Sequence, residues 1–67
     1  MNKFSERLKI ALEQKQMSQR QLSKLIDKSQ SVVNNYCTGK REPTLDVLLK
    51  ISKALNVTAD FLIGIED

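Results

Sequence analysis

The sequence contains no histidine and only one cysteine, Cys37. The absence of histidine removes the usual general base and the commonest zinc ligand, and one thiol can neither form an intramolecular disulfide nor complete a metal site. We therefore expect no catalytic centre, no cofactor and no metal site. Small secreted domains normally carry disulfides, so the sequence favours a protein of the reducing cytoplasm.

Long apolar runs are also absent. No stretch approaches the roughly 18 apolar residues that a membrane span needs. Residues 1–7 lack the apolar centre of a signal peptide. We expect neither membrane insertion nor secretion.

Aromatic residues are few: Phe4, Tyr36 and Phe61, all at positions that fit a helical core. Proteins that bind single-stranded nucleic acid usually expose several aromatic side chains on which bases stack. If the chain binds nucleic acid, double-stranded DNA is therefore the better target.

The length and the charge of the chain point to a small surface-binding module. With 67 residues there is room for one domain, residues 1–67, and for a thin core. The net charge is +3, but residues 1–43 carry nine basic and four acidic side chains, whereas residues 44–67 carry two basic and four acidic ones. This asymmetry suits a polyanionic partner for the first part of the chain.

Apolar residues recur at helical spacing and nowhere alternate with the period of a strand, which predicts an all-α fold. The expected helices are a compact bundle of five, at about 3–15, 19–26, 30–37, 45–55 and 59–63. Their inward positions are expected to be Phe4, Leu8, Ala11, Leu12, Leu22, Leu25, Ile26, Val33, Tyr36, Leu45, Val47, Leu48, Leu49, Ile51, Ala54 and Leu55.

Polar residues mark where these helices begin and end. Ser18 and Gln21 have the spacing of a capping box, in which each side chain bonds the other residue's backbone N–H. The other expected N-caps are Asn2, Ser29, Thr44 and Thr58. The expected helix ends are Asp27, Gly39, Asn56 and Gly64, and Pro43 keeps the segment before residue 44 out of a helix.

The most informative feature is the outward face of the helix at 30–37. If Val33 and Tyr36 point inward, the side chains left facing outward are Gln30, Ser31, Asn34 and Asn35. Glutamine and asparagine can bond the edge of adenine with two hydrogen bonds, and serine can bond several bases. Two short helices joined by a tight turn, at about residues 18–38, are the arrangement that places such a face in the major groove of DNA. The alternative is an ordinary solvated helix face.

The chain resembles the lambda-repressor-like, Cro/C1-type (XRE family) helix-turn-helix proteins of bacteria and their phages. The resemblance extends over residues 4–64. It is carried by Ser18, Gln19, Leu22, residues 28–31, Val33, residues 39–43, residues 45–57 and residues 60–64.

The resemblance implies a role for each matching position. Gln30, Ser31 and Asn35 match base-reading positions, with Asn34 at the rim. Gln19 matches a glutamine that contacts phosphate and can brace Gln30. The other positions expected at phosphates are Lys28, Thr38, Lys40, Arg41 and Thr44; for Lys28, simple solvation is an equal alternative.

Three residues depart from the family pattern. Ser23 stands where alanine is usual and needs a backbone carbonyl for its hydroxyl. Asp27 stands where glycine is usual, at a conformational cost. Cys37 stands where an acidic residue is common; we expect a small buried filler there rather than a redox switch, since a second cysteine is lacking.

These expectations describe a non-enzymatic transcriptional regulator, a repressor that binds a double-stranded DNA operator as a homodimer. Phe61, Ile63 and Ile65 are a candidate dimer contact. One alternative is a protein-interaction module of the same fold, such as an antitoxin or another regulatory partner. A second is the DNA-binding domain of a longer repressor.

Overall fold

The computed structural model describes residues 3–65, and this part of the chain forms five helices without a strand. The helices are α1 (Phe4–Gln14), α2 (Gln19–Leu25), α3 (Gln30–Thr38), α4 (Leu45–Leu55) and α5 (Ala59–Ile63). The predicted all-α fold of five helices is confirmed. Lys3 is the N-cap of α1, and Asn2, the expected cap, lies outside the described residues. None of the described helices is both long and apolar enough to cross a bilayer.

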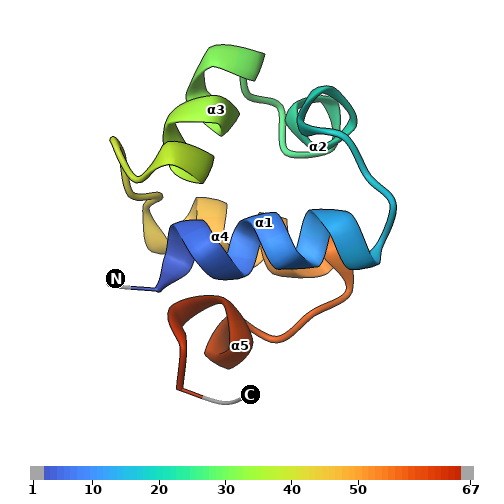
Figure 1. Cartoon of the computed structure of the whole chain (residues 1–67). Coiled ribbons are helices and arrows are strands. Elements are labelled where there is room, and N and C mark those ends of the chain that lie inside the picture. The colour runs from blue at the N-terminus through green and yellow to red at the C-terminus, as the bar shows by residue number, and fades with distance from the viewer. Residues whose placement is uncertain (1–2, 66–67) are drawn as a thin grey trace.

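Helix α1 lies at the centre of the arrangement (Figure 1). It packs against α3 on one side and α5 on the other, while α2 packs mainly against α3 and less against α4. Helix α4 lies behind α1 in this view and also contacts α5. Helices α2 and α3 therefore form one end of the molecule, and α5 forms the opposite end (Figure 1).

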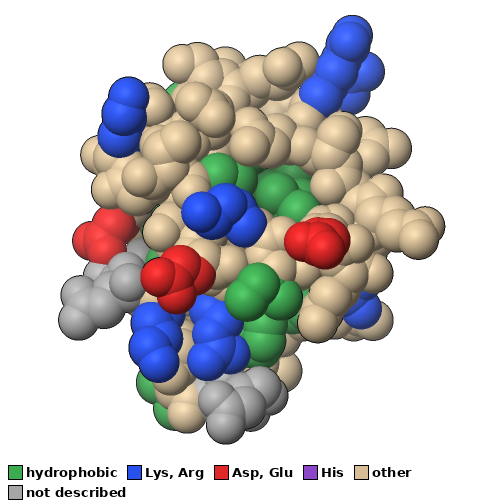
Figure 2. All heavy atoms as spheres, viewed as in Figure 1, with side chains coloured by type: hydrophobic (Ala, Val, Ile, Leu, Met, Phe, Trp, Pro, Cys, Tyr) green, Lys and Arg blue, Asp and Glu red, His purple; other side chains and the backbone are tan. Residues whose placement is uncertain are grey.

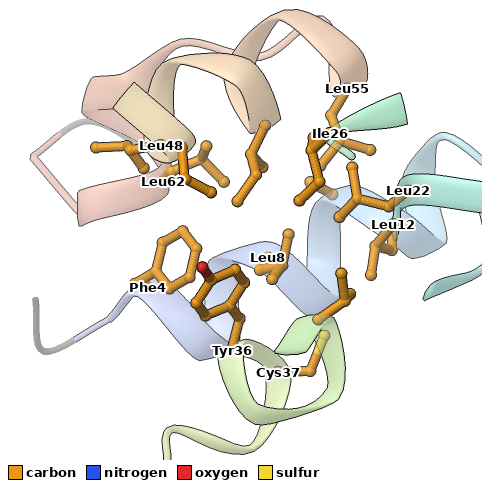
Figure 3. Close-up of a cluster of buried hydrophobic side chains, with 14 residues drawn as sticks. Phe4, Leu8, Leu12, Leu22, Ile26, Tyr36, Cys37, Leu48, Leu55 and Leu62 are labelled. Atoms are coloured by element: carbon orange, nitrogen blue, oxygen red, sulfur yellow. The ribbon is translucent and has the colours of Figure 1, made fainter. Parts of the chain in front are cut away.

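The core lies between these helices, and Figure 3 shows its side chains converging from every helix. The buried apolar residues are Phe4, Leu8, Ala11, Leu12, Leu22, Ile26, Val33, Tyr36, Cys37, Val47, Leu48, Ile51, Leu55 and Leu62. Most of the expected inward positions are thus confirmed. Ala54 is half-buried and packs against this cluster.

Three expected core residues are exposed instead. Leu25 is 60% exposed, Leu45 69% and Leu49 45%. In and just after α2, the buried apolar side chains are those of Leu22 and Ile26. Leu25 follows Leu22 by three residues, so its side chain is rotated by about 300° around the helix axis and lies outside this narrow contact. In α4 the buried strip consists of Val47, Leu48, Ile51 and Leu55. Leu45 and Leu49 are one turn apart and lie on the opposite side of the helix.

The expected helix caps are present. The Gln21 N–H donates to Ser18 Oγ at 3.0 Å, and the Ser18 N–H donates to Gln21 Oε1 at 2.8 Å, which completes the capping box. Ser29, Thr44 and Thr58 each accept a hydrogen bond from the backbone N–H three residues later. An N-cap of this kind contributes about 1 kcal/mol to helix stability.

Left-handed backbone ends several of the helices, as expected. Asp27 has a φ of 58°, Asn56 of 54° and Gly39 of 79°. Gln16, between α1 and α2, also has a positive φ, 53°, and this was not expected because glutamine rarely adopts that conformation. There the Met17 N–H bonds the Leu12 carbonyl at 2.9 Å, which closes the end of α1.

Candidate nucleic-acid interface

The turn between α2 and α3 is closed by backbone hydrogen bonds. Asp27 takes the left-handed conformation just after α2. The Lys28 N–H then donates to the Ser23 carbonyl at 2.9 Å, and Ser29 caps α3. The chain reverses within a few residues, so α2 and α3 are held as a tight pair.

Ser23 lies in the packed part of this pair and is only 4% exposed. Its hydroxyl donates to the Arg20 carbonyl at 2.7 Å. The expectation that a serine fits here if its hydroxyl finds a backbone carbonyl is therefore confirmed.

Helix α3 has an inner and an outer face. Its inner face carries the buried side chains of Val33, Tyr36 and Cys37, so the expected core position of Tyr36 is confirmed. The outer face carries the exposed side chains of Gln30, Ser31, Asn34 and Thr38. Asn35 lies at the edge between the two faces and is half-buried.

The Asn35 carbonyl attaches the loop after α3 to the helix. The Asn35 carbonyl oxygen accepts hydrogen bonds from the N–H groups of Lys40, at 3.0 Å, and Arg41, at 3.2 Å. It also accepts the Thr38 hydroxyl at 3.3 Å. Gly39 permits this geometry with its positive φ. The exposed side chains of Lys40 and Arg41 therefore start from a fixed place beside the end of α3.

The remaining predicted phosphate contacts lie on α2, in the turn before α3 and at the start of α4. Gln19 is half-buried at the first position of α2, and Lys28 is exposed in the turn between α2 and α3. Thr44 is exposed at the far end of the loop, where its hydroxyl accepts the Val47 N–H at 3.3 Å and caps α4. These residues therefore precede or begin three successive helices, α2, α3 and α4.

The outer face of α3 is polar and uncharged. Helix α3 contains no acidic or basic residue. Figure 2 shows a broad surface of uncharged polar side chains and backbone over α2 and α3, with Lys or Arg side chains at its two sides. Such a surface can donate and accept hydrogen bonds while its flanks attract anions.

Cys37 is not part of the exposed surface. It is a buried free cysteine on the inner face of α3. Burial raises the pKa of its thiol, and the positive charge of Lys9 opposes this in part. The expected role of a small buried filler is confirmed. Within residues 3–65, no three side chains of the metal-binding types histidine, cysteine, aspartate and glutamate gather closely enough to hold an ion.

Two of the three residues of the candidate dimer contact are partly buried. Ile65 is 70% exposed, but Phe61 and Ile63 are partly buried against the core. The guanidinium carbon of Arg7 lies 4.8 Å from the centre of the Phe61 ring, so this ring is covered by α1. Among the three residues, only Ile65 presents most of its side chain.

Comparison with known proteins identifies similar sequences. Residues 8–62 match a helix-turn-helix family model, HTH_3. The chain is 37% identical over 60 residues to the SPbeta prophage-derived uncharacterized HTH-type transcriptional regulator YonR of Bacillus subtilis (strain 168). The alignment covers 90% of this chain and 56% of that protein, so the chain spans about half the length of this relative. No solved structure matches the chain.

Proposed function

Because the chain belongs to the XRE, Cro/C1-type helix-turn-helix family, we propose that it is a sequence-specific regulator of transcription that binds double-stranded DNA. In this proposal α3 enters the major groove and reads one half-site of an operator, and binding represses transcription. A relative that covers most of this chain carries the name of an HTH-type transcriptional regulator, which supports the proposal.

The observation that carries the proposal is the outer face of α3. Gln30, Ser31 and Asn34 are exposed together on a helix without charge. Amide side chains on such a face can bond base edges in the major groove, and each good two-bond contact is worth about 1–3 kcal/mol of discrimination. Asn35 lies at the half-buried edge of this face and is assigned to a base edge on the floor of the groove.

The residues around α3 are assigned to the DNA backbone. Lys28 precedes α3, and Lys40 and Arg41 follow it, so positively charged residues lie at both ends of α3. Phosphate contacts of this kind fix the register of the protein on the duplex but carry no sequence information. Gln19, Thr38 and Thr44 supply uncharged hydrogen-bonding groups to the same backbone.

The key experiment is selection of binding sites from a pool of random duplexes, followed by titration of the selected duplex and of bulk DNA at about 150 mM salt. A specific regulator retains a recurring short sequence and binds it at least about a thousandfold more tightly than bulk DNA. No preference for any duplex would reject the proposal and favour the protein-interaction module. A reporter gene placed behind the selected site then distinguishes repression from activation.

We further propose that the protein acts as a homodimer. One recognition helix reads only a few base pairs, and two half-sites about 34 Å apart restore specificity. The exposed apolar side chains of Leu45 and Leu49 on α4, and of Ile65 after α5, support a contact with a second copy.

Sedimentation at tens of micromolar protein tests the dimer. The double substitution Leu45→Ser with Leu49→Ser should shift the protein toward monomer, while Leu25→Ser, at the exposed end of α2, should not. A monomeric wild type would favour the second candidate, in which the chain is the DNA-binding domain of a longer repressor that dimerises through another part. The greater length of the relative supports that candidate.

A further inference from the structure

The side chains of Gln30 and Asn34 form one row along the outer face of α3. They are four residues apart, so they lie on the same side of the helix, and both are exposed. Their spacing corresponds to about 6 Å along the helix axis, or about two steps of 3.4 Å between successive bases of one strand. The two amides can therefore reach two different base pairs.

Neither amide is used within the protein. Across residues 3–65, the side chains of Gln30 and Asn34 make no hydrogen bond. The amide of Gln21 on α2, by contrast, accepts the Ser18 N–H at 2.8 Å and belongs to a helix cap. The donor and the acceptor of both α3 amides are thus available to a partner.

The partner that suits two such amides is adenine. In the major groove adenine presents the acceptor N7 beside the N6 amino donor, which matches the one donor and one acceptor of an amide edge. Guanine presents two acceptors, which suit arginine or lysine, and the cytosine amino group suits an acidic side chain. Helix α3 has no basic and no acidic residue. Its outer face therefore favours A·T pairs.

This contact uses a hydrogen atom that a methyl group can replace. The N6 amino group of adenine carries two hydrogens, of which one pairs with thymine and the other points into the major groove. In a paired N6-methyladenine the methyl group takes the place of the second hydrogen. The donor is then lost and the amide oxygen faces an apolar group, which leaves it without a partner and costs free energy.

We propose that methylation of adenine N6 in the operator half-site abolishes sequence-specific binding by this protein, because the methyl group blocks the contacts of Gln30 and Asn34. This inference rests on the proposed function, since it uses α3 as the helix in the major groove. The phosphates assigned to Lys28, Lys40 and Arg41 are unchanged by the methyl group. A methylated site should therefore be bound as bulk DNA is bound.

The test uses the duplex selected for the proposed function, with its adenines changed one at a time. One series carries N6-methyladenine. The other carries 7-deazaadenine, in which a C–H group replaces N7 and the amino group remains. The controls are N6-methyladenine in the flanks outside the selected site and 7-deazaguanine at each guanine within it. Wild-type affinity is titrated at about 150 mM salt.

The expected result is that the same adenines respond to both changes. Two adenines about two steps or less apart should each lose about 5–150-fold in affinity, which corresponds to about 1–3 kcal/mol. The flanking N6-methyladenine and the 7-deazaguanine controls should leave the affinity nearly unchanged.

The variants Gln30→Ala and Asn34→Ala assign the two adenines. Each should bind the unmodified duplex more weakly than wild type and lose no further affinity when its own adenine is methylated. Methylation of the other adenine should still weaken its binding. Gln14→Ala removes an exposed amide from α1 and should keep the full response at both adenines.

The other outcomes separate this inference from the proposed function. A wild type that prefers no duplex rejects the proposed function itself. A wild type that binds the selected duplex but tolerates N6-methyladenine at every position overturns this inference alone. A response to 7-deazaguanine only also overturns it and assigns base reading to a basic side chain such as Lys28. A methylation response that persists fully in both alanine variants overturns it as well. Because the modified bases leave the protein unchanged, the main test does not depend on how a variant folds.

Discussion

Tyr36, on the inner face of α3, packs edge to face against Phe4 of α1, with ring centroids 6.1 Å apart and an angle of 79° between the ring planes. Both rings are almost completely buried. The pair therefore joins the first turn of the central helix to the helix whose outer face carries Gln30 and Asn34. The orientation of that outer face depends on a contact that lies entirely within the core.

Phe4→Ala should destabilise the domain by about 3–5 kcal/mol, because it removes a buried ring and one side of the aromatic pair. This is comparable with the whole stability of a domain of this size. Urea denaturation measures the change, with Phe4→Leu as the control that keeps much of the apolar volume and should lose less. A loss below about 1 kcal/mol for Phe4→Ala would show that the pair is not a main support of α3.

Gln30→Ala and Arg41→Ala should have different effects on DNA binding. Loss of the Gln30 amide should reduce discrimination at one base pair by about 1–3 kcal/mol and leave binding to bulk DNA nearly unchanged. Loss of the Arg41 charge should weaken binding to all sequences and lower the salt slope by about 0.9. Titrations against matched and mismatched duplexes separate the two. The same phenotype for both variants would contradict the assigned roles.

Ser23→Ala should change the free energy of unfolding by less than about 0.5 kcal/mol, because the Arg20 carbonyl that accepts the serine hydroxyl remains part of the helical hydrogen-bond ladder. Ser23→Val should cost about 1–3 kcal/mol, since the added methyl groups must enter a closely packed contact. Thermal unfolding compares the two. Equal stability of the valine variant and wild type would mean that α2 and α3 are less tightly packed here than the burial of Ser23 indicates.

Asp27 should be better replaced by glycine than by alanine, because its φ is 58°. Glycine removes the left-handed strain of about 1–2 kcal/mol that an L-residue can carry, while it adds about 0.4–1 kcal/mol of unfolded-state entropy, so a net gain of about 0.5 kcal/mol is expected. Asp27→Ala should lose about 1 kcal/mol. Lys28→Ala, at the next position and without a positive φ, serves as the control. An alanine variant more stable than the glycine variant would contradict this account.

The stability of the domain should fall at alkaline pH through Cys37. Burial raises the pKa of this thiol in the folded state above its ordinary value of 9.0. Below the unfolded pKa the thiol is neutral in both states, so the stabilisation is complete. As the pH rises above it, the unfolded thiol ionises first and the contribution is lost. Urea unfolding at about pH 7 and about pH 10 should show a larger loss for wild type than for Cys37→Ala. A larger loss of stability for Cys37→Ala than for wild type would contradict a raised pKa of the folded-state thiol.

Local hydrogen bonds and backbone preferences were readable from the sequence because their partners are only a few residues apart. Ser18 and Gln21 form their capping box within one turn, and Gly39 ends α3 through its own φ. The five helices, most of the core strip and the exposed amides of α3 follow from this short-range information together with helical periodicity. The positive φ of Gln16 was missed because no glycine, asparagine or aspartate marks it.

What only the tertiary structure decided is which of several possible apolar strips is buried and which groups from separate elements lie side by side. Periodicity allows Leu25, Leu45 and Leu49 to face inward, but the directions of the neighbouring helices leave them exposed. The attachment of the Lys40 and Arg41 N–H groups to the Asn35 carbonyl depends in the same way on how the loop packs against the end of α3. The sequence by itself determined the helices and the chemistry of the outer face of α3. Packing determined which residues flank that face, because several sides of a helix could face the core and the contacts with neighbouring helices decide which side is buried.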